Sequence, residues 1–123
     1  MTLEQLNEYL LSKPGARLDY PFGDDVPVLK IKGKMFALVG KRDWKGVPTT
    51  MLNLKCDPDE SFAVRDLFPS ITTGYHMNKK HWISIYFDDS VPAGEVERLI
   101  DSSYELVVSK LPKLARISLL ADG

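Results

Sequence analysis

The segment from Trp82 to Phe87 alternates strictly between two kinds of residue, and this alternation constrains the fold more than any other feature. Successive side chains of a β-strand point to opposite faces, so the segment predicts a strand with two different faces. The apolar set is Ile83, Ile85 and Phe87, and the amphipathic set is Trp82, Ser84 and Tyr86. We expect the apolar set to face the hydrophobic core.

The segment directly before this strand is dense in hydrogen-bond donors. Residues 74–81 are Gly-Tyr-His-Met-Asn-Lys-Lys-His, and lysine, histidine and asparagine side chains donate to phosphates or to the polar edges of ligands. We predict that Asn78 caps a single turn leading into Trp82. Two interpretations stay open: a functional edge of the protein, or a solvated turn beside a buried tryptophan.

The length of 123 residues suits one domain, residues 1–123, which can bury a core without disulfides or metals. Cys56 is the only cysteine, which excludes an internal disulfide and suits a reducing compartment. The first residues carry acid rather than base, and no long apolar run occurs. We therefore expect no signal peptide, no membrane contact, a cytoplasmic location and a monomer.

The charge is unevenly distributed along the chain. The net charge of −1 argues against a generic polyanion binder. Residues 30–56, however, hold seven bases and one acid, a net charge of +6, and such asymmetry can build a local positive face on a neutral protein. One alternative is a solvated strand surface, since lysines commonly protect exposed sheet edges from aggregation.

Turn and capping signals divide the chain into elements. The predicted helices are residues 2–13, with a capping box at Thr2-Leu3-Glu4-Gln5, residues 57–67, with Asp57 as N-cap, and a third that begins near Pro92 and ends near residue 113. The predicted strands are residues 26–32, 35–40, 49–56, 70–73 and 82–87. We interpret residues 16–25 as an irregular loop that folds Tyr20 and Phe22 onto the core. Residues 41–48 are interpreted as a long hairpin loop with an exposed Trp44, and residues 114–123 as a short helix or a frayed end.

This order predicts an α+β fold: a two-layer α-β3-α-β2-α domain with an antiparallel sheet and helices packed mainly on one face. The other sheet face would then be open or only partly covered. The residues predicted to point outward there are Lys30, Lys32, Asn53, Lys55, Trp82, Ser84 and Tyr86. Bases and aromatic rings on one sheet surface would suit nucleic acid.

Several stretches resemble the MmcQ/YjbR family of small bacterial proteins. They are Lys13-Pro14-Gly15, Tyr20-Pro21-Phe22-Gly23, residues 30–38 and 53–56, the specific run Gly74-Tyr75-His76-Met77-Asn78-Lys79-Lys80-His81-Trp82, and Ser103-Tyr104-Glu105-Leu106-Val107. The resemblance implies a YjbR-like fold similar to that of secretion chaperones and of the N-terminal domain of TfoX-type proteins. It also implies DNA binding.

These observations favour a non-enzymatic DNA-binding or nucleic-acid-binding protein. The predicted contact residues are Lys30, Lys32, Lys55, Lys79 and Lys80 for phosphates, Trp44, Trp82 and Tyr86 for stacking, and His76, Asn78 and His81 for polar contacts. The alternative is a chaperone-like module that binds a partner peptide through the sheet or residues 20–23. We expect no catalytic residue, cofactor or metal, because His76 and His81 lack a zinc spacing and no nucleophile motif or phosphate-binding glycine loop occurs.

Overall fold

The computed structural model describes residues 1–122. Six strands form one antiparallel sheet in the order β1-β2-β3-β4-β6-β5. The strands are β1 (Ala16–Asp19), β2 (Val28–Ile31), β3 (Lys34–Trp44), β4 (Val47–Lys55), β5 (Ile71–Thr73) and β6 (Trp82–Tyr86). The helices are α1 (Leu3–Ser12), α2 (Pro58–Leu67), α3 (Ala93–Ser109) and α4 (Lys113–Asp122). None of these helices is both long enough and apolar enough to cross a membrane.

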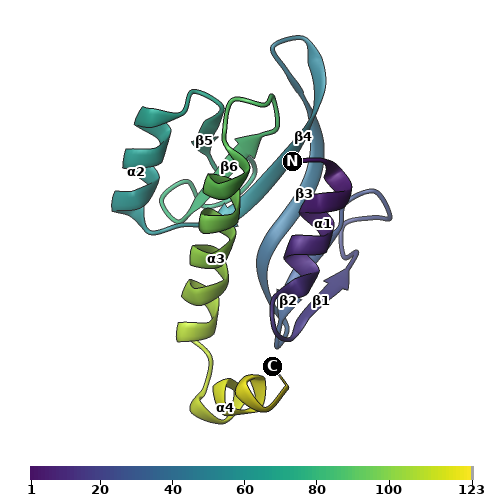
Figure 1. Ribbon diagram of the computed structural model, residues 1–123, viewed down its shortest axis with the longest axis vertical. Coiled ribbons are helices and arrows are strands. Elements are labelled where there is room, and N and C mark those ends of the chain that lie inside the picture. Colours follow the sequence, from purple (N-terminus) through teal and green to yellow (C-terminus); the bar gives the residue numbers. More distant parts are fainter. Residues whose placement is uncertain (123) are drawn as a thin grey trace.

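The helices α1 and α3 lie against the same face of the sheet, as Figure 1 shows, and the hydrophobic core lies between these two layers. Leu54 and Ile83 pair across β4 and β6 and are fully buried toward α3. The α+β class with an antiparallel sheet is therefore confirmed, as is the core role of Ile83 and Ile85. The structure adds a strand, β1, and a fourth helix, α4, to the predicted order.

The predicted loop at residues 16–25 is wrong in its first half. Residues 16–19 form the edge strand β1, paired antiparallel with β2. An edge strand leaves most of its side chains in solvent, so β1 carries no apolar alternation that would reveal it. The rings of Tyr20 and Phe22 are 44% and 67% exposed rather than part of the core.

The predicted loop at residues 41–48 is also wrong, because β3 and β4 continue to Trp44 and Val47. Only Lys45 and Gly46 form the turn, with φ angles of 53° and 84°. Two consecutive residues in the left-handed region match the twist of a hairpin, so a two-residue turn suffices. The β2–β3 turn repeats this geometry at Lys32 and Gly33, with φ of 50° and 80°.

The second face of the sheet is covered at its centre, which agrees with the predicted alternative of partial cover, but the predicted outward exposure of Asn53, Ser84 and Tyr86 is wrong. Asn53, Ser84 and Tyr86 are at most 1% exposed. Residues 74–77 pass over this face, held by hydrogen bonds to the buried side chains. Tyr75 N donates to Ser84 Oγ at 2.9 Å, Ser84 Oγ donates to Asn53 Oδ1 at 2.5 Å, and Asn53 Nδ2 donates to Tyr75 O at 3.2 Å. These polar residues thus fix the position of the covering loop.

Helix α1 is tied to α3 by Asp101. Its Oδ1 accepts hydrogen bonds from Tyr9 Oη and Lys13 Nζ, both at 2.7 Å. Partial burial acts to raise the pKa of Asp101, but these two donors outweigh burial and hold the pKa below its ordinary value.

We expect Asp101→Asn to destabilise the protein by at most about 1 kcal/mol at neutral pH, because the pair is partly exposed and screened. A carboxyl with a lowered folded-state pKa stabilises above its unfolded pKa, and this contribution is lost as pH falls through the folded-state value. The difference from wild type should therefore shrink as pH falls below the ordinary carboxyl pKa of about 3.9. Urea denaturation at neutral pH and at a series of acid pH values measures it, and a constant difference would contradict the ion-pair account.

Helix α4 closes the end of the sheet where β1 and β2 meet (Figure 1). Leu119 is buried, and a Cβ added at Gly15 would lie 2.4 Å from its Cδ2 atom. Lys32 Nζ donates to Ser118 Oγ at 3.1 Å, and Tyr104 Oη donates to the Pro14 carbonyl. Residues 113–122 are therefore helical and packed on the rest of the domain.

Candidate nucleic-acid interface

The predicted site residues fall into four places rather than one surface. Trp44 at the tip of the β3–β4 hairpin and Tyr86 at the end of β6 form one group. The tryptophan ring stacks on the Tyr86 ring with centroids 4.1 Å apart and 6° between planes, and Trp44 Nε1 donates to Asp88 Oδ2 at 3.1 Å. Tyr86 is buried, so its prediction as a stacking surface is wrong.

This group also includes Arg42, which the sequence analysis did not select. Its guanidinium lies 3.7 Å from the Tyr75 ring centroid, and Nη1 donates to Tyr86 Oη at 2.6 Å. His76 touches the same Tyr75 ring edge-on at 4.1 Å between centroids. Arg42 therefore joins the covering loop to the hairpin.

The turn before β6 has the predicted cap. Asn78 Oδ1 accepts from the backbone N of Lys80 at 2.9 Å and of His81 at 3.3 Å. This carbonyl oxygen is thus engaged in the turn itself. The side chains of Lys79, Lys80 and His81 are exposed beside the first residue of β6.

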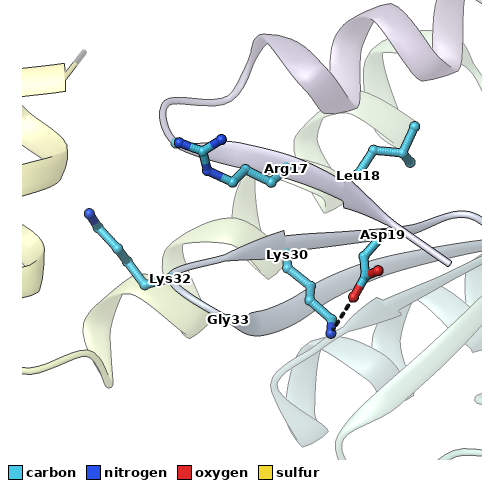
Figure 2. A pocket seen from close by; sticks show the side chains of 7 residues that line it. Arg17, Leu18, Asp19, Lys30, Lys32 and Gly33 are labelled. Carbon is cyan, nitrogen blue, oxygen red and sulfur yellow. Dashed lines mark hydrogen bonds and ion pairs between the residues drawn. The ribbon is translucent and has the colours of Figure 1, made fainter. Parts of the chain in front are cut away.

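Lys30 and Lys32 line a groove of about 430 Å³ beside the edge strand β1; Figure 2 shows its residues, and we call it the edge groove. Lys30 Nζ is paired with Asp19 Oδ2 at 2.8 Å, and this hydrogen bond lowers the pKa of Asp19. Arg17 and Lys32 extend instead toward the end of the groove at α4 (Figure 2). The charge of Lys30 is thus neutralised by Asp19. Arg17, which was not predicted as a site residue, joins Lys32 as a second cation of this groove.

Lys55 and Trp82 line a second cavity, of about 440 Å³. We call it the lysine pocket; its lining residues are Lys34, Met35, Lys55, Trp82, Val107, Lys110, Leu111 and Pro112. Antiparallel pairing places the start of β3, the end of β4 and the start of β6 at one end of the sheet, and α3 ends beside them. Trp82 is the register partner of Lys55. A Cβ at Gly74 would lie 2.7 Å from the Trp82 Cβ, so the absence of a side chain at Gly74 permits this close approach.

The cations of the lysine pocket have no acidic partner. The ion pairs among residues 1–122 involve Lys13, Lys30 and Arg98, and none includes a lysine of the pocket. No hydrogen bond from the Trp82 indole N–H occurs within the same residues, whereas the Trp44 indole is bonded and stacked. The lysine pocket therefore combines uncompensated charge with an unengaged tryptophan.

The edge groove and the lysine pocket are neighbours. Lys32 lines the groove, Lys34 lines the pocket, and Gly33 lies between them in the β2–β3 turn. The exposed Lys79 and Lys80 precede Trp82 on the other side. We define the basic track as Arg17, Lys32, Lys34, Lys55, Lys79, Lys80 and Lys110. Of these, the residues predicted from sequence are Lys32, Lys55, Lys79 and Lys80.

The sole cysteine is not a reactive thiol. Burial, together with the nearby Glu60 and Asp57 carboxylates, raises the pKa of Cys56 to about 12. The thiol therefore stays protonated at neutral pH, and the thiolate is the nucleophilic form. Within residues 1–122, no three His, Cys, Asp or Glu side chains gather in a way that could hold a metal ion.

Comparison with known proteins finds bacterial relatives of this chain. A family model described as YjbR matches residues 11–106. The uncharacterized protein YbdF of Escherichia coli O157:H7 is 42% identical over 110 residues, which cover 89% of this chain and 87% of that protein. The uncharacterized protein YjbR of Escherichia coli K12 is 29% identical over 116 residues, covering 94% and 95%.

Solved structures share the fold. The crystal structure of Deinococcus radiodurans protein DR2400, described as a DUF419 domain, has a TM-score of 0.83 at 35% identity, with 96% of this chain and 87% of that chain covered. A Pseudomonas syringae protein solved by crystallography has a TM-score of 0.76 at 26% identity, covering 86% and 98%. The α+β architecture is therefore common to these proteins.

Proposed function

The chain belongs to the YjbR family, and from that premise we propose that it acts as a nucleic-acid-binding protein rather than an enzyme, with the basic track as its contact surface. The relatives YbdF and YjbR are described as uncharacterized proteins. Support for the proposal therefore comes from the residues of this chain. The observation that carries it is the lysine pocket, where Lys34, Lys55 and Lys110 line one cavity with Trp82 and form no ion pair within residues 1–122.

Each element of this surface has a role in nucleic-acid binding. Lysine ammonium groups attract phosphates and release condensed counterions, which makes affinity fall with salt. An aromatic ring that stacks on a base contributes about 1–3 kcal/mol. Lys79 and Lys80 extend the charge beyond the pocket along the turn before β6. The net charge of −1 means that this attraction is local, so we expect modest affinity at physiological salt.

Neutralising two pocket lysines tests the proposal. We expect Lys55→Gln/Lys110→Gln to weaken binding to a labelled single strand about tenfold at low salt. The slope of log K against log salt should become shallower by about 1.4, because each phosphate contact on a single strand contributes about 0.7. Fluorescence anisotropy at several salt concentrations measures both quantities.

The matched control is Lys41→Gln/Lys45→Gln, which removes the same charge from exposed positions on the β3–β4 hairpin, outside the basic track. Its affinity and slope should stay close to wild type. Equal losses in the two double variants would point to a general charge effect and reject the pocket as the contact site. Absence of binding by the wild-type protein at low salt would reject the proposed function.

Peptide binding is a second candidate function, favoured by the exposed rings of Tyr20 and Phe22. Contiguous patches of large apolar side chains in solvent mark contact sites for other proteins, and Tyr20 and Phe22 lie two residues apart in one loop. Such contacts are not screened by salt, so a partner held there would stay bound at high salt. Replacing Phe22 with serine should release that partner and leave the DNA affinity unchanged. Loss of DNA affinity in this variant would instead join the loop to the nucleic-acid surface.

A further inference from the structure

The composition of the lysine pocket identifies the class of nucleic acid that it fits. We propose that the pocket accepts one unpaired base against Trp82, while its lysines hold the adjacent phosphates, so that the protein prefers single-stranded over double-stranded nucleic acid. This inference rests on the proposed function and deepens it by naming the substrate class.

The walls of the pocket are suited to more than phosphate. Besides Trp82, the apolar side chains of Met35, Val107 and Leu111 line it. A surface that only attracted the sugar-phosphate backbone would need cations and no apolar cavity. Its volume of about 440 Å³ lies in the range of pockets that hold small molecules. A lining of apolar side chains together with lysines therefore matches a flat base with phosphates beside it.

Pairing and stacking keep the bases of a duplex out of such a cavity. A base inside a duplex is stacked on both neighbours and bonded to its partner, and it must be extruded at a cost in free energy before it can enter a pocket. The bases of a single strand have lost their pairing partner and can turn outward. A duplex would meet the lysines through its backbone without placing a base in the pocket, so it would gain charge attraction but no stacking on Trp82.

The two tryptophans show which ring is available. Trp44 already stacks on Tyr86 and donates its indole N–H to Asp88. Trp82 is half-buried in the pocket wall, and its N–H donates to no group among residues 1–122. Trp82 can thus offer both a stacking surface and a donor to the polar edge of a base.

This difference provides a direct measurement. Since the chain has two tryptophans, the Trp44→Phe variant leaves Trp82 as the only tryptophan emitter. We would titrate this variant at low salt with a single strand of about 12 nucleotides and with a hairpin duplex of the same sequence. We expect the single strand to quench Trp82 emission and to bind at least about tenfold more tightly than the duplex. The duplex should bind weakly and leave the emission nearly unchanged.

The variant Trp82→Leu, which keeps Trp44, then separates stacking from charge. By anisotropy, it should lose most of the preference for the single strand while it keeps duplex binding through the lysines. Should this variant fail to fold, Trp82→Phe preserves a ring and is expected to keep the preference for the single strand. The quenching of Trp82 emission in the Trp44→Phe protein then still tests whether a base contacts Trp82.

The outcomes distinguish a failure of the single-strand preference from a failure of nucleic-acid binding itself. Equal binding of both forms without quenching of Trp82 would overturn this inference and leave the proposed function intact. Binding of neither form by the wild-type protein would overturn the proposed function, and this inference with it. Tighter binding of the duplex than of the single strand would overturn the single-strand preference and leave the proposed function intact.

Discussion

Replacing Asn53 with aspartate is expected to destabilise the protein by about 3–5 kcal/mol at neutral pH, because it leaves a buried charge without a compensating partner. Asn53 is 1% exposed, and its amide nitrogen donates to the Tyr75 carbonyl. A carboxylate oxygen in place of the amide nitrogen would face the Tyr75 carbonyl oxygen, and both of these groups can only accept hydrogen bonds. The free energy of unfolding should decrease, and the covering loop at residues 74–77 should no longer be held in place by this hydrogen bond.

The loss should depend on pH with a definite sign. Burial raises the folded-state pKa of the introduced carboxyl above the ordinary value of about 3.9. Below that value the group is protonated in both states and can donate to Tyr75, so the variant should approach wild-type stability. As pH rises, the unfolded state ionises first and the variant loses stability until the folded-state pKa is passed. Urea denaturation from acid to neutral pH measures this course.

Asn78→Asp is the matched control for this change. At Asn78 the oxygen is the engaged atom, accepting from two backbone N–H groups in an exposed turn. A carboxylate accepts equally well there, so we expect a change within about 0.5 kcal/mol. Similar losses at the two positions would contradict the role assigned to the Asn53 amide.

Replacing Ser103 with alanine is expected to cost about 2–4 kcal/mol, because it leaves two buried backbone groups without partners. Ser103 is fully buried on α3. Its Oγ donates to the Phe36 carbonyl at 2.6 Å and accepts from Lys55 N at 2.9 Å. The register of β3 and β4 starts from Ala37 paired with Leu54, so the hydroxyl bridges the two strands just beyond their last paired residues.

The neighbouring Ser102→Ala provides the comparison on the same helix. Ser102 is half-buried, and its side chain makes no hydrogen bond within residues 1–122. We expect a change within about 0.5 kcal/mol, measured by urea denaturation with an unchanged m-value. A Ser103→Ala protein as stable as the Ser102 variant would show that water replaces the missing hydroxyl.

The local signals in the sequence were sufficient for the elements that rest on local chemistry. The capping box at Thr2, the N-cap at Asp57 and the turn cap at Asn78 are all confirmed. Each depends on side chains a few residues apart. The edge strand β1 was missed because its exposed side chains carry no alternation, and the β3–β4 hairpin was shortened because its outer half is charged.

The sequence predicts which face of the sheet a side chain points to more reliably than it predicts whether that side chain is exposed. Asn53 and Ser84 do point away from the helices, as register pairing shows. Alternation cannot reveal, however, that residues 74–77 return over that face and bury them. Two lysines of the pocket, Lys34 and Lys110, were missed for a similar reason, since they come from the start of β3 and the end of α3. Their proximity to Trp82 arises only when the layers assemble.

The turn at Pro14 and Gly15, directly before β1, packs against residues from the C-terminal part of the chain, and this affects the order of folding. Gly15 near the start of the chain lies against Leu119, and Tyr104 bonds to the carbonyl of Pro14, 90 positions earlier. Contacts between such distant residues slow folding, because a long loop must close before they form. During synthesis this turn stays uncovered until α4 has left the ribosome, although β1 can already pair with β2. Until then the nascent domain exposes the β1–β2 end of its sheet, which makes this end a site that needs protection from aggregation.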